Sequence, residues 1–277
     1  MKNIISAAAV LALGATFSSA FAATVTVTPT DSQGWVRSEF RDVSTGPYTS
    51  NTVGAINGTY PPAGDGGSVE MSSTDGSGKV DFSKYFTNVT FADLTSLSYD
   101  WYRSSASTAG APLAPAIRIG YDADGNLATT ADAGYLVFEP IYQVPVANPP
   151  AATDAWVTAN AKNGVLWQHQ LSPGADTFNG GSQVFQNLQG WMTSGQQGNG
   201  DLLSGNSLVT EINFGIGSGW SGSFSGAVDH VSIGLNDNIT TYDFEPASIA
   251  AVPEPSTYGL MALGLAAVAF VARRKKA

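Results

Sequence analysis

The sequence contains no cysteine. Disulfide bonds, thiol catalysis and cysteine-ligated zinc are therefore excluded, and the fold must rest on its apolar core or on a bound ion. Histidine is also scarce, because only His169 and His230 occur. A hydrolytic triad needs a histidine beside a nucleophile, and no Gly-x-Ser-x-Gly turn precedes a helical segment. Serine hydrolysis and a histidine zinc site are therefore not expected.

Charged residues make up only 12% of the chain, and acidic residues outnumber basic ones by 22 to 12. The net charge is −10 at neutral pH. Such a surface repels nucleic acid and anionic lipid, so neither is expected as a partner. It suits cations or neutral polymers. The low charge, together with regularly spaced aromatic residues, also argues against a disordered polyelectrolyte.

Residues 1–22 have the pattern of a secretory signal peptide. Lys2 supplies a positive start, residues 4–17 are uncharged and mostly apolar, and Ala20 and Ala22 give the small-x-small cleavage pattern. Nothing amphipathic appears in this stretch, which disfavours a buried N-terminal helix. We therefore expect export and cleavage after Ala22.

Long apolar runs are absent from the interior, but a short one occupies residues 258–272. At 15 residues it would span about 22 Å as a helix, less than the roughly 30 Å of a hydrocarbon core. The basic residues 273–276 that follow should stay cytoplasmic. This segment is a marginal transmembrane helix, better suited to transit than to permanent anchoring.

The C-terminal segment 251–277 resembles the PEP-CTERM sorting signal in three features that occur in a fixed order. A Pro-Glu-Pro motif is followed by the apolar run and then by a basic cluster. The resemblance implies recognition by an exosortase, and therefore a Gram-negative bacterium that makes exopolysaccharide. It implies export across the inner membrane to the cell surface or extracellular matrix. The residues that would form the sorting signal are Pro253, Glu254, Pro255, Arg273 and Arg274.

Residues 23–250 are expected to form one all-β domain. Cutting both ends removes five basic residues and one acid, which takes the net charge from −10 to −14. Leu97, Tyr99 and Trp101 alternate with polar neighbours, as in a half-buried strand. Similar patterns predict strands at 24–28, 35–40, 68–71, 79–82, 97–101, 116–121, 135–139, 210–216, 228–235 and 241–244.

The remaining segments complete the predicted architecture. Residues 156–159 and 165–170 read as a hairpin, 182–192 as one short helix capped by Ser182, and 45–67 as a long loop. We predict a jelly-roll-like two-sheet β-sandwich with one short helix.

The domain is also similar to a recurring bacterial extracellular domain that is often found on such tails. The resemblance supports fold and location more than function, because the members are largely of unassigned activity. The matching stretches are Gly34 with Trp35, 61–64 with 67–69, 94–101, 117–126, 136–140, Trp156 with Val157, Trp167, Asp229 with Val231, and 242–246.

Two segments carry the spacing of a calcium site. Asp122, Asp124 and Asn126 alternate around a Gly-containing turn, with Asp132 as the next acid. The same residues also suit an ordinary Asp-Gly-Asn turn between strands. An alternative site combines Asp237, Asp243 and Glu245 near the closing strand, where jelly-roll sugar-binding modules often hold a structural calcium.

Three tryptophans are candidates for stacking on sugar rings, because a flat aromatic face combines apolar area with a polar edge. They are Trp220 in a Gly/Ser loop, and Trp156 and Trp167 in the predicted hairpin. Burial in the core is the competing interpretation for each. Trp101 and Trp191 lie on apolar stripes and are predicted to be core residues.

These features favour a non-enzymatic, exosortase-sorted surface or matrix protein that binds exopolysaccharide or lies within a biofilm. No catalytic residue is assigned. A glycan-active hydrolase or lyase is the alternative, for which a carboxylate pair would have to come from Glu139, Glu211, Asp100 and Asp229. A purely structural or adhesive module with no small ligand is the third possibility.

Overall fold

The computed structural model describes residues 22–38, 52–76, 78–143, 149–193, 198–217 and 219–246. The predicted sorting segment 251–277 lies outside the described residues, as does the predicted signal peptide apart from Ala22. No helix within the described residues has the length and apolarity needed to cross a bilayer.

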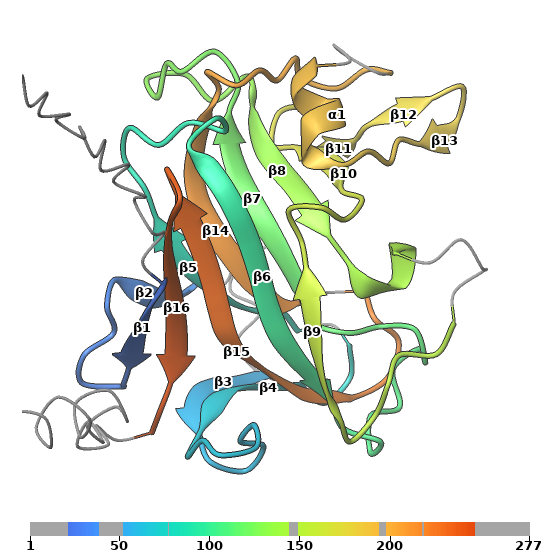
Figure 1. Ribbon diagram of the computed structural model, residues 1–277. Helices are drawn as coiled ribbons and strands as arrows, with labels where there is room; N and C mark the ends of the chain where they lie inside the picture. Colours follow the sequence, from blue (N-terminus) through green and yellow to red (C-terminus); the bar gives the residue numbers. More distant parts are fainter. Residues whose placement is uncertain are drawn as a thin grey trace, which may run out of the picture.

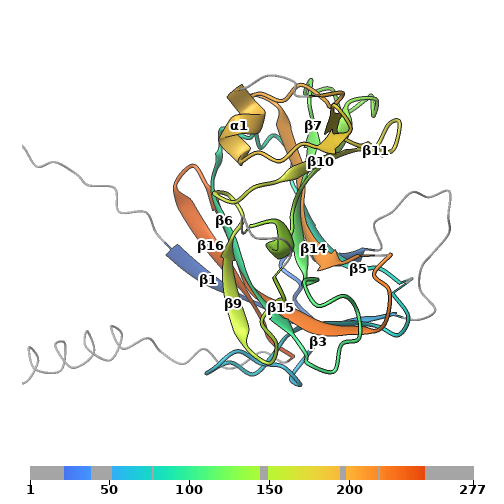
Figure 2. The same ribbon diagram turned by 90° about the vertical axis from the view of Figure 1, so that its right-hand side faces the viewer.

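The described chain is nearly all β, with two seven-stranded sheets that face each other (Figures 1 and 2). Sheet A comprises β1 (Ala22–Val27), β3 (Thr52–Asn57), β4 (Ser68–Ser73), β6 (Leu94–Arg103), β9 (Trp156–Asn160), β15 (Phe224–Leu235) and β16 (Asn238–Phe244). Sheet B has the order β11 (Ala175–Asp176), β10 (Trp167–Gln170), β8 (Ala133–Phe138), β7 (Ala116–Asp122), β14 (Leu208–Ile216), β5 (Val80–Tyr85) and β2 (Trp35–Ser38).

Few elements lie outside these sheets. A small pair, β12 (Phe178–Asn179) with β13 (Ser182–Gln183), and a short helix, α1 (Leu188–Thr193), lie at the β10 end of sheet B, at the top of Figure 1. A single 3-10 turn, η1 (Pro140–Tyr142), follows β8. The predicted class, a two-sheet sandwich with one short helix, is therefore confirmed.

The alternation in the sequence decides which face of each strand enters the core. In β6, Leu97, Tyr99 and Trp101 are buried while their neighbours are half-exposed. All ten strands predicted from alternation overlap observed strands. Each fully buried large side chain contributes roughly 1.5–3 kcal/mol through the apolar surface that it removes from water. The core between the sheets is therefore the main source of stability.

Strand β15 changes its neighbour halfway along its length. Its first half pairs with β4 as far as Val228, and its second half pairs with β16 from Val231 onward. A bulge against β6 lies at this point, and His230 adopts a positive φ of 46°. The extra residue restores the alternation, so that Val228, Val231 and Ile233 all face the core.

Three local predictions were wrong. The expected hairpin does not form, because β9 pairs with β6 in sheet A while β10 pairs with β8 in sheet B. The helix begins at Leu188, and Ser182 belongs to β13 rather than capping it. The expected loop 45–67 contains β3, which pairs with β4. In each case pairing between distant segments overrides the local pattern.

Candidate functional site

A band of polar and aromatic side chains crosses the outer face of sheet B. The strand registers place one residue from each of six neighbouring strands in a single row. Glu211 and Tyr135, in the interior of this row, are 3% and 5% exposed, whereas Tyr85 at its edge is 61% exposed. In sheet order the row is Tyr85, Glu211, Gly120, Tyr135, His169 and Asp176.

Two residues of this row meet above a glycine. The Tyr135 hydroxyl donates a hydrogen bond to Glu211 Oε1. A Cβ atom at Gly120 would lie 2.7 Å from Glu211 Cγ and 3.3 Å from Tyr135 Cε1, so only glycine leaves room for the pair. Burial raises the pKa of Glu211, and burial beside Glu211 raises that of Tyr135.

A buried polar network holds the neighbouring row in place. Arg118 Nη1 donates to Asp81 Oδ1 at 2.7 Å and to Asn213 Oδ1 at 2.6 Å. Asn213 Nδ2 donates in turn to the Ser83 hydroxyl at 2.8 Å. Lys79 Nζ lies 3.3 Å from Asp81 Oδ2. Charge-assisted hydrogen bonds of this kind fix the directions of the side chains, so the residues of this network hold fixed positions beside the band.

Aromatic residues gather at the β10 end of the band. Trp167 is partly exposed, and its Nε1 donates to Glu139 Oε2 at 2.9 Å. Burial raises the pKa of Glu139, an effect that this hydrogen bond partly offsets. Tyr142 and Phe185 are 36% and 37% exposed and pack with ring centroids 4.7 Å apart. This end therefore combines exposed rings with a carboxylate.

A histidine and an acid complete the same end of the band. His169 Nδ1 lies 2.8 Å from Asp176 Oδ1, and both side chains are partly exposed. Aromatic rings with a few polar groups beside them are common components of ligand-binding sites, where the polar groups fix the orientation of the ligand.

The tryptophans predicted to stack on sugars lie in three different settings. Trp220 is 9% exposed and packs edge-on against Phe224, so its faces are not open to solvent. Trp156, on sheet A, is partly exposed and tilted against Tyr102. Trp167 belongs to the band. Trp101 and Trp191 are buried in the core, as predicted.

The first predicted calcium site is brought together at the end of β7. Asp122, Asp124 and Asp132 place carboxylate oxygens within 4.8 Å of one another. Asp132 Oδ2 accepts from the Asp124 amide, and Asp124 Oδ1 accepts from the Asn126 amide, as in an ordinary turn. Burial raises the pKa of Asp122, whose Oδ1 has no hydrogen-bond partner. Calcium binding here stays a prediction.

The second predicted site is not brought together as the sequence suggested. Asp243 and Glu245 lie at one end of β16, and Asp237 lies at the other, about 20 Å away along the strand. Asp65, from the β3–β4 connection, takes the third place, with carboxylate oxygens within 4.8 Å of those of Asp243 and Glu245. Nothing local in the sequence marks Asp65, because only folding brings that connection to β16.

The four carboxylates considered for catalysis divide between the two sheets. Glu139 and Glu211 share the outer face of sheet B. Asp100 and Asp229 are cross-strand neighbours on sheet A. Burial raises the pKa of Asp229. Burial also acts upward on the pKa of Asp100, but hydrogen bonds from His230 and Thr158 outweigh it and lower that pKa.

Several residues of the band were missed by sequence reasoning. Tyr135 of the band, and Asp81, Arg118 and Asn213 of the network beside it, face outward from strands whose other face is apolar. A signal was available, since polar residues at alternate positions mark one face of a strand. It could not be used without the registers that place these residues side by side.

The C-terminal segment beyond the described residues was compared with protein families. Residues 251–275 match the PEP-CTERM protein-sorting motif. The motif marks an exported protein that is sorted by an exosortase, as the Pro-Glu-Pro motif and the basic cluster predicted. The PEP-CTERM match covers the tail alone and describes none of the sandwich. Among proteins of curated function, none matches the chain.

Solved structures overlap the sandwich loosely. A family 11 carbohydrate-binding module of a cellulosomal cellulase from Clostridium thermocellum is 12% identical, with 78% of this chain and 91% of the module covered and a TM-score of 0.34. A carbohydrate esterase of bacteriophage phi24B is 13% identical, with 74% of this chain and 91% of the esterase covered and a TM-score of 0.35. A carbohydrate-binding module specific for non-crystalline cellulose, CBM28, is 13% identical, with 73% of this chain and 87% of the module covered and a TM-score of 0.30. Such low scores transfer neither ligand nor activity to this chain.

Proposed function

We propose that this protein is a non-enzymatic, exosortase-sorted component of the cell surface or extracellular matrix of a Gram-negative bacterium. We propose further that the band on sheet B binds a neutral exopolysaccharide. The observation that carries the proposal is the row of side chains across six strands. Strands about 4.8 Å apart give such a row a length of about 24 Å, enough for several sugar units.

The chemistry of the band supports a sugar polymer as the ligand. Tyr142, Phe185 and Trp167 offer aromatic surface, while Glu139 and His169 offer hydrogen-bonding groups beside it. Sugars present apolar ring faces and polar edges, so this mixture suits them. The acidic balance of the chain disfavours polyanionic glycans, because like charges repel.

The test is retention of the full chain in affinity gels that contain the producing organism's own exopolysaccharide. We expect retention there and none with alginate in the absence of divalent cations. Trp167→Ala should weaken retention about tenfold, equivalent to ~1.4 kcal/mol. Trp156→Ala is the matched control, because this partly exposed tryptophan lies on the other sheet. Unchanged retention of Trp167→Ala would remove the band as the binding site.

The second candidate is a glycan-active enzyme that uses the same face. The observation in its favour is that Glu139 and Glu211 share this face and that burial raises the pKa of both, as a general acid requires. Release of new reducing ends from the exopolysaccharide, abolished by Glu139→Gln or Glu211→Gln, would establish it. A folded chain with neither retention nor hydrolysis would favour the purely structural or adhesive role.

A further inference from the structure

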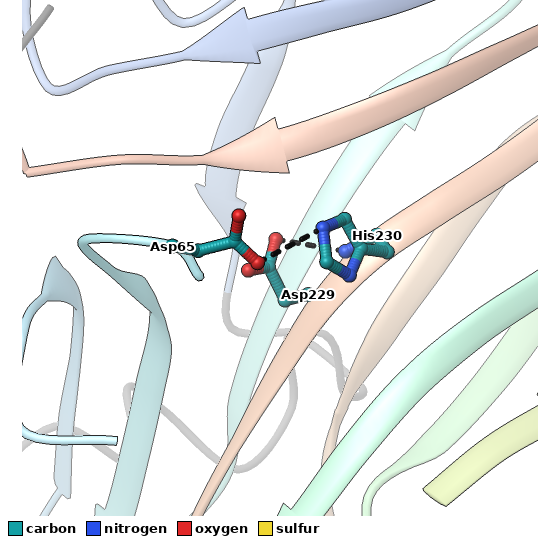
Figure 3. A group of neighbouring side chains, drawn as sticks. All are labelled: Asp65, Asp229 and His230. Carbon is teal, nitrogen blue, oxygen red and sulfur yellow. Dashed lines mark hydrogen bonds and ion pairs between the residues drawn. The ribbon is translucent and has the colours of Figure 1, made fainter. Parts of the chain in front are cut away.

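The point where β15 exchanges β4 for β16 gathers an unusual concentration of carboxylates. Asp229 lies in the bulge, and Asp243 and Glu245 lie at the end of β16. The β3–β4 connection, residues 58–67, brings Asp65 against them (Figure 3). Figure 3 shows the Asp65 carboxylate directed toward Asp229 and the His230 ring.

The ligand atoms form two groups that share Asp65. In one group, Asp65, Asp243 and Glu245 place carboxylate oxygens within 4.8 Å of one another. In the other, carboxylate oxygens of Asp65 and Asp229 and a ring nitrogen of His230 lie within 4.8 Å of one another. Asp229 is 0% exposed and Glu245 is 1% exposed, so neither carboxylate is simply solvated.

Hydrogen bonds account for only part of these oxygens. Asp229 Oδ1 accepts from the amides of His230 at 2.7 Å and Phe244 at 2.9 Å. Glu245 Oε1 accepts from the Gly66 amide at 2.9 Å. Three buried oxygens have no hydrogen-bond partner: Asp229 Oδ2, Asp243 Oδ1 and Glu245 Oε2. Buried carboxylate oxygens in this state need a cation or a donor.

Positive charge is also in short supply around this cluster. His230 pairs with Asp65 through Nε2 at 3.2 Å and with Asp100 through Nδ1 at 2.9 Å. Both ring nitrogens are therefore engaged. Among the ion pairs of the described residues, His230 is the one cation that contacts these carboxylates. A single histidine cannot balance the charge of Asp65, Asp243 and Glu245 together with that of Asp100.

The connection that carries Asp65 packs closely against the end of β16. A Cβ atom at Gly67 would lie 3.0 Å from the Phe244 carbonyl oxygen and 2.3 Å from Pro246 Cδ. The connection that carries Asp65 is therefore pressed directly onto the end of β16. The Glu245 amide donates to the Val27 carbonyl oxygen at 2.8 Å, which ties the end of β1 to the same place.

We propose that Asp65, Asp243 and Glu245 bind a calcium ion that joins the β3–β4 connection to the end of the last strand. Calcium takes six to eight oxygen ligands in flexible geometry, and carboxylates supply them. Magnesium is a poorer match, because it demands a near-ideal octahedron and keeps most of its water. Millimolar affinity suffices outside the cell, as in other extracellular modules.

The position of this site gives it a structural consequence. Pro246 is the last described residue, and the Pro-Glu-Pro motif begins at Pro253. The ion therefore holds the final residues of the sandwich at the point where the sorting segment leaves it. Calcium would close the domain on the side from which the tail emerges.

Amide hydrogen exchange of the full chain with calcium chloride or EGTA locates the ion without any substitution. We expect calcium to slow exchange at least tenfold in peptides covering residues 60–67 and 242–246. Equal concentrations of magnesium chloride should give less protection. No calcium-dependent protection in these two segments would overturn the proposal, and equal protection by magnesium would overturn the choice of ion.

Variants separate this site from the turn at the end of β7. Asp243→Asn and Asp65→Asn should abolish protection of residues 60–67, whereas Asp124→Asn should leave it intact. Asp237→Asn, an exposed aspartate at the other end of β16, is the matched control. Protection that survives in Asp65→Asn and Asp243→Asn would overturn the assignment. If Asp243→Asn does not fold, Asp65→Asn and the exchange of the unaltered chain still decide it.

Discussion

The Tyr135 hydroxyl and the Glu211 carboxylate meet through a hydrogen bond directly above Gly120. Tyr135 comes from β8, Glu211 from β14, and Gly120 from β7 between them. The pair lies at the centre of the proposed polysaccharide-binding band. Because all three strands belong to the middle of sheet B, disturbance of this contact should affect both stability and binding.

Gly120→Ala tests the space that the pair occupies. The added methyl group would overlap Glu211 Cγ at 2.7 Å, so one of the two side chains must move. We expect the free energy of unfolding to fall by about 1–3 kcal/mol, together with weaker retention on exopolysaccharide. Gly110→Ala is the control, because its nearest neighbour would be Leu113 Cδ1 at 3.5 Å. Equal urea-unfolding midpoints for the two variants would contradict the packing argument.

Glu211→Gln should change the pH dependence of stability. Burial raises the pKa of Glu211 above its ordinary value of 4.5, so the folded chain binds this proton more tightly than the unfolded chain does. The unaltered chain therefore loses stability as pH rises from 4.5 through the raised pKa, and the loss levels off above it.

The measurement is the difference in melting temperature between Glu211→Gln and the unaltered chain at pH 4 and pH 8. The melting temperature of the variant relative to the unaltered chain should be higher at pH 8 than at pH 4, because the buried glutamine carries no charge whereas Glu211 is ionised at high pH. Asp31→Asn, at an exposed position, removes the same charge and serves as control. A difference that is the same at both pH values would refute the assignment.

Arg118→Ala should destabilise the fold through the charge that it leaves behind. Asp81 is 0% exposed and would lose its 2.7 Å partner, while Asn213 would lose a donor. We expect the free energy of unfolding to fall by about 3 kcal/mol. This is the lower end of the range for breaking a buried ion pair, because Lys79 remains near Asp81. The double variant Arg118→Leu/Asp81→Leu should recover part of it. A double variant as unstable as Arg118→Ala would contradict this account.

Trp220→Ala should act on stability rather than on binding. The side chain is 9% exposed and its ring lies 5.0 Å from that of Phe224, so truncation leaves a cavity. The expected loss is about 3–5 kcal/mol in urea unfolding. At temperatures where the variant remains folded, its retention on exopolysaccharide should equal that of the unaltered chain. Weak retention by folded Trp220→Ala would restore this tryptophan as a binding residue.

Replacement of Pro253, Glu254 and Pro255 by alanine should block sorting in the producing bacterium. The motif lies within the matched segment 251–275, and an exosortase that reads it would no longer process the chain. We expect the variant to accumulate uncleaved in the membrane fraction, as judged by its mass. Thr257→Ala lies just outside the motif and should be processed normally. Normal release of the triple variant would remove the motif from the pathway.

Sequence and structure contributed differently to the proposed binding band. The strands β6 and β14 could be predicted because apolar and polar residues alternate along them. The all-β class was predicted from this alternation. The hairpin expected from Trp156 and Trp167 was wrong because β9 and β10 find partners in different sheets. Local pattern predicts that a strand forms, but the partner depends on contacts distant in sequence.

The sequence by itself determined the sorting signal of this protein and its fold class. The tail motif is read as a linear signal, and strand periodicity is a local property of neighbouring residues. Only the tertiary structure decided which side chains share a site. Tyr85 and Asp176 fall at the two ends of one band, and Asp65 replaces Asp237 beside Asp243, because strand register and loop closure act between segments far apart in the chain.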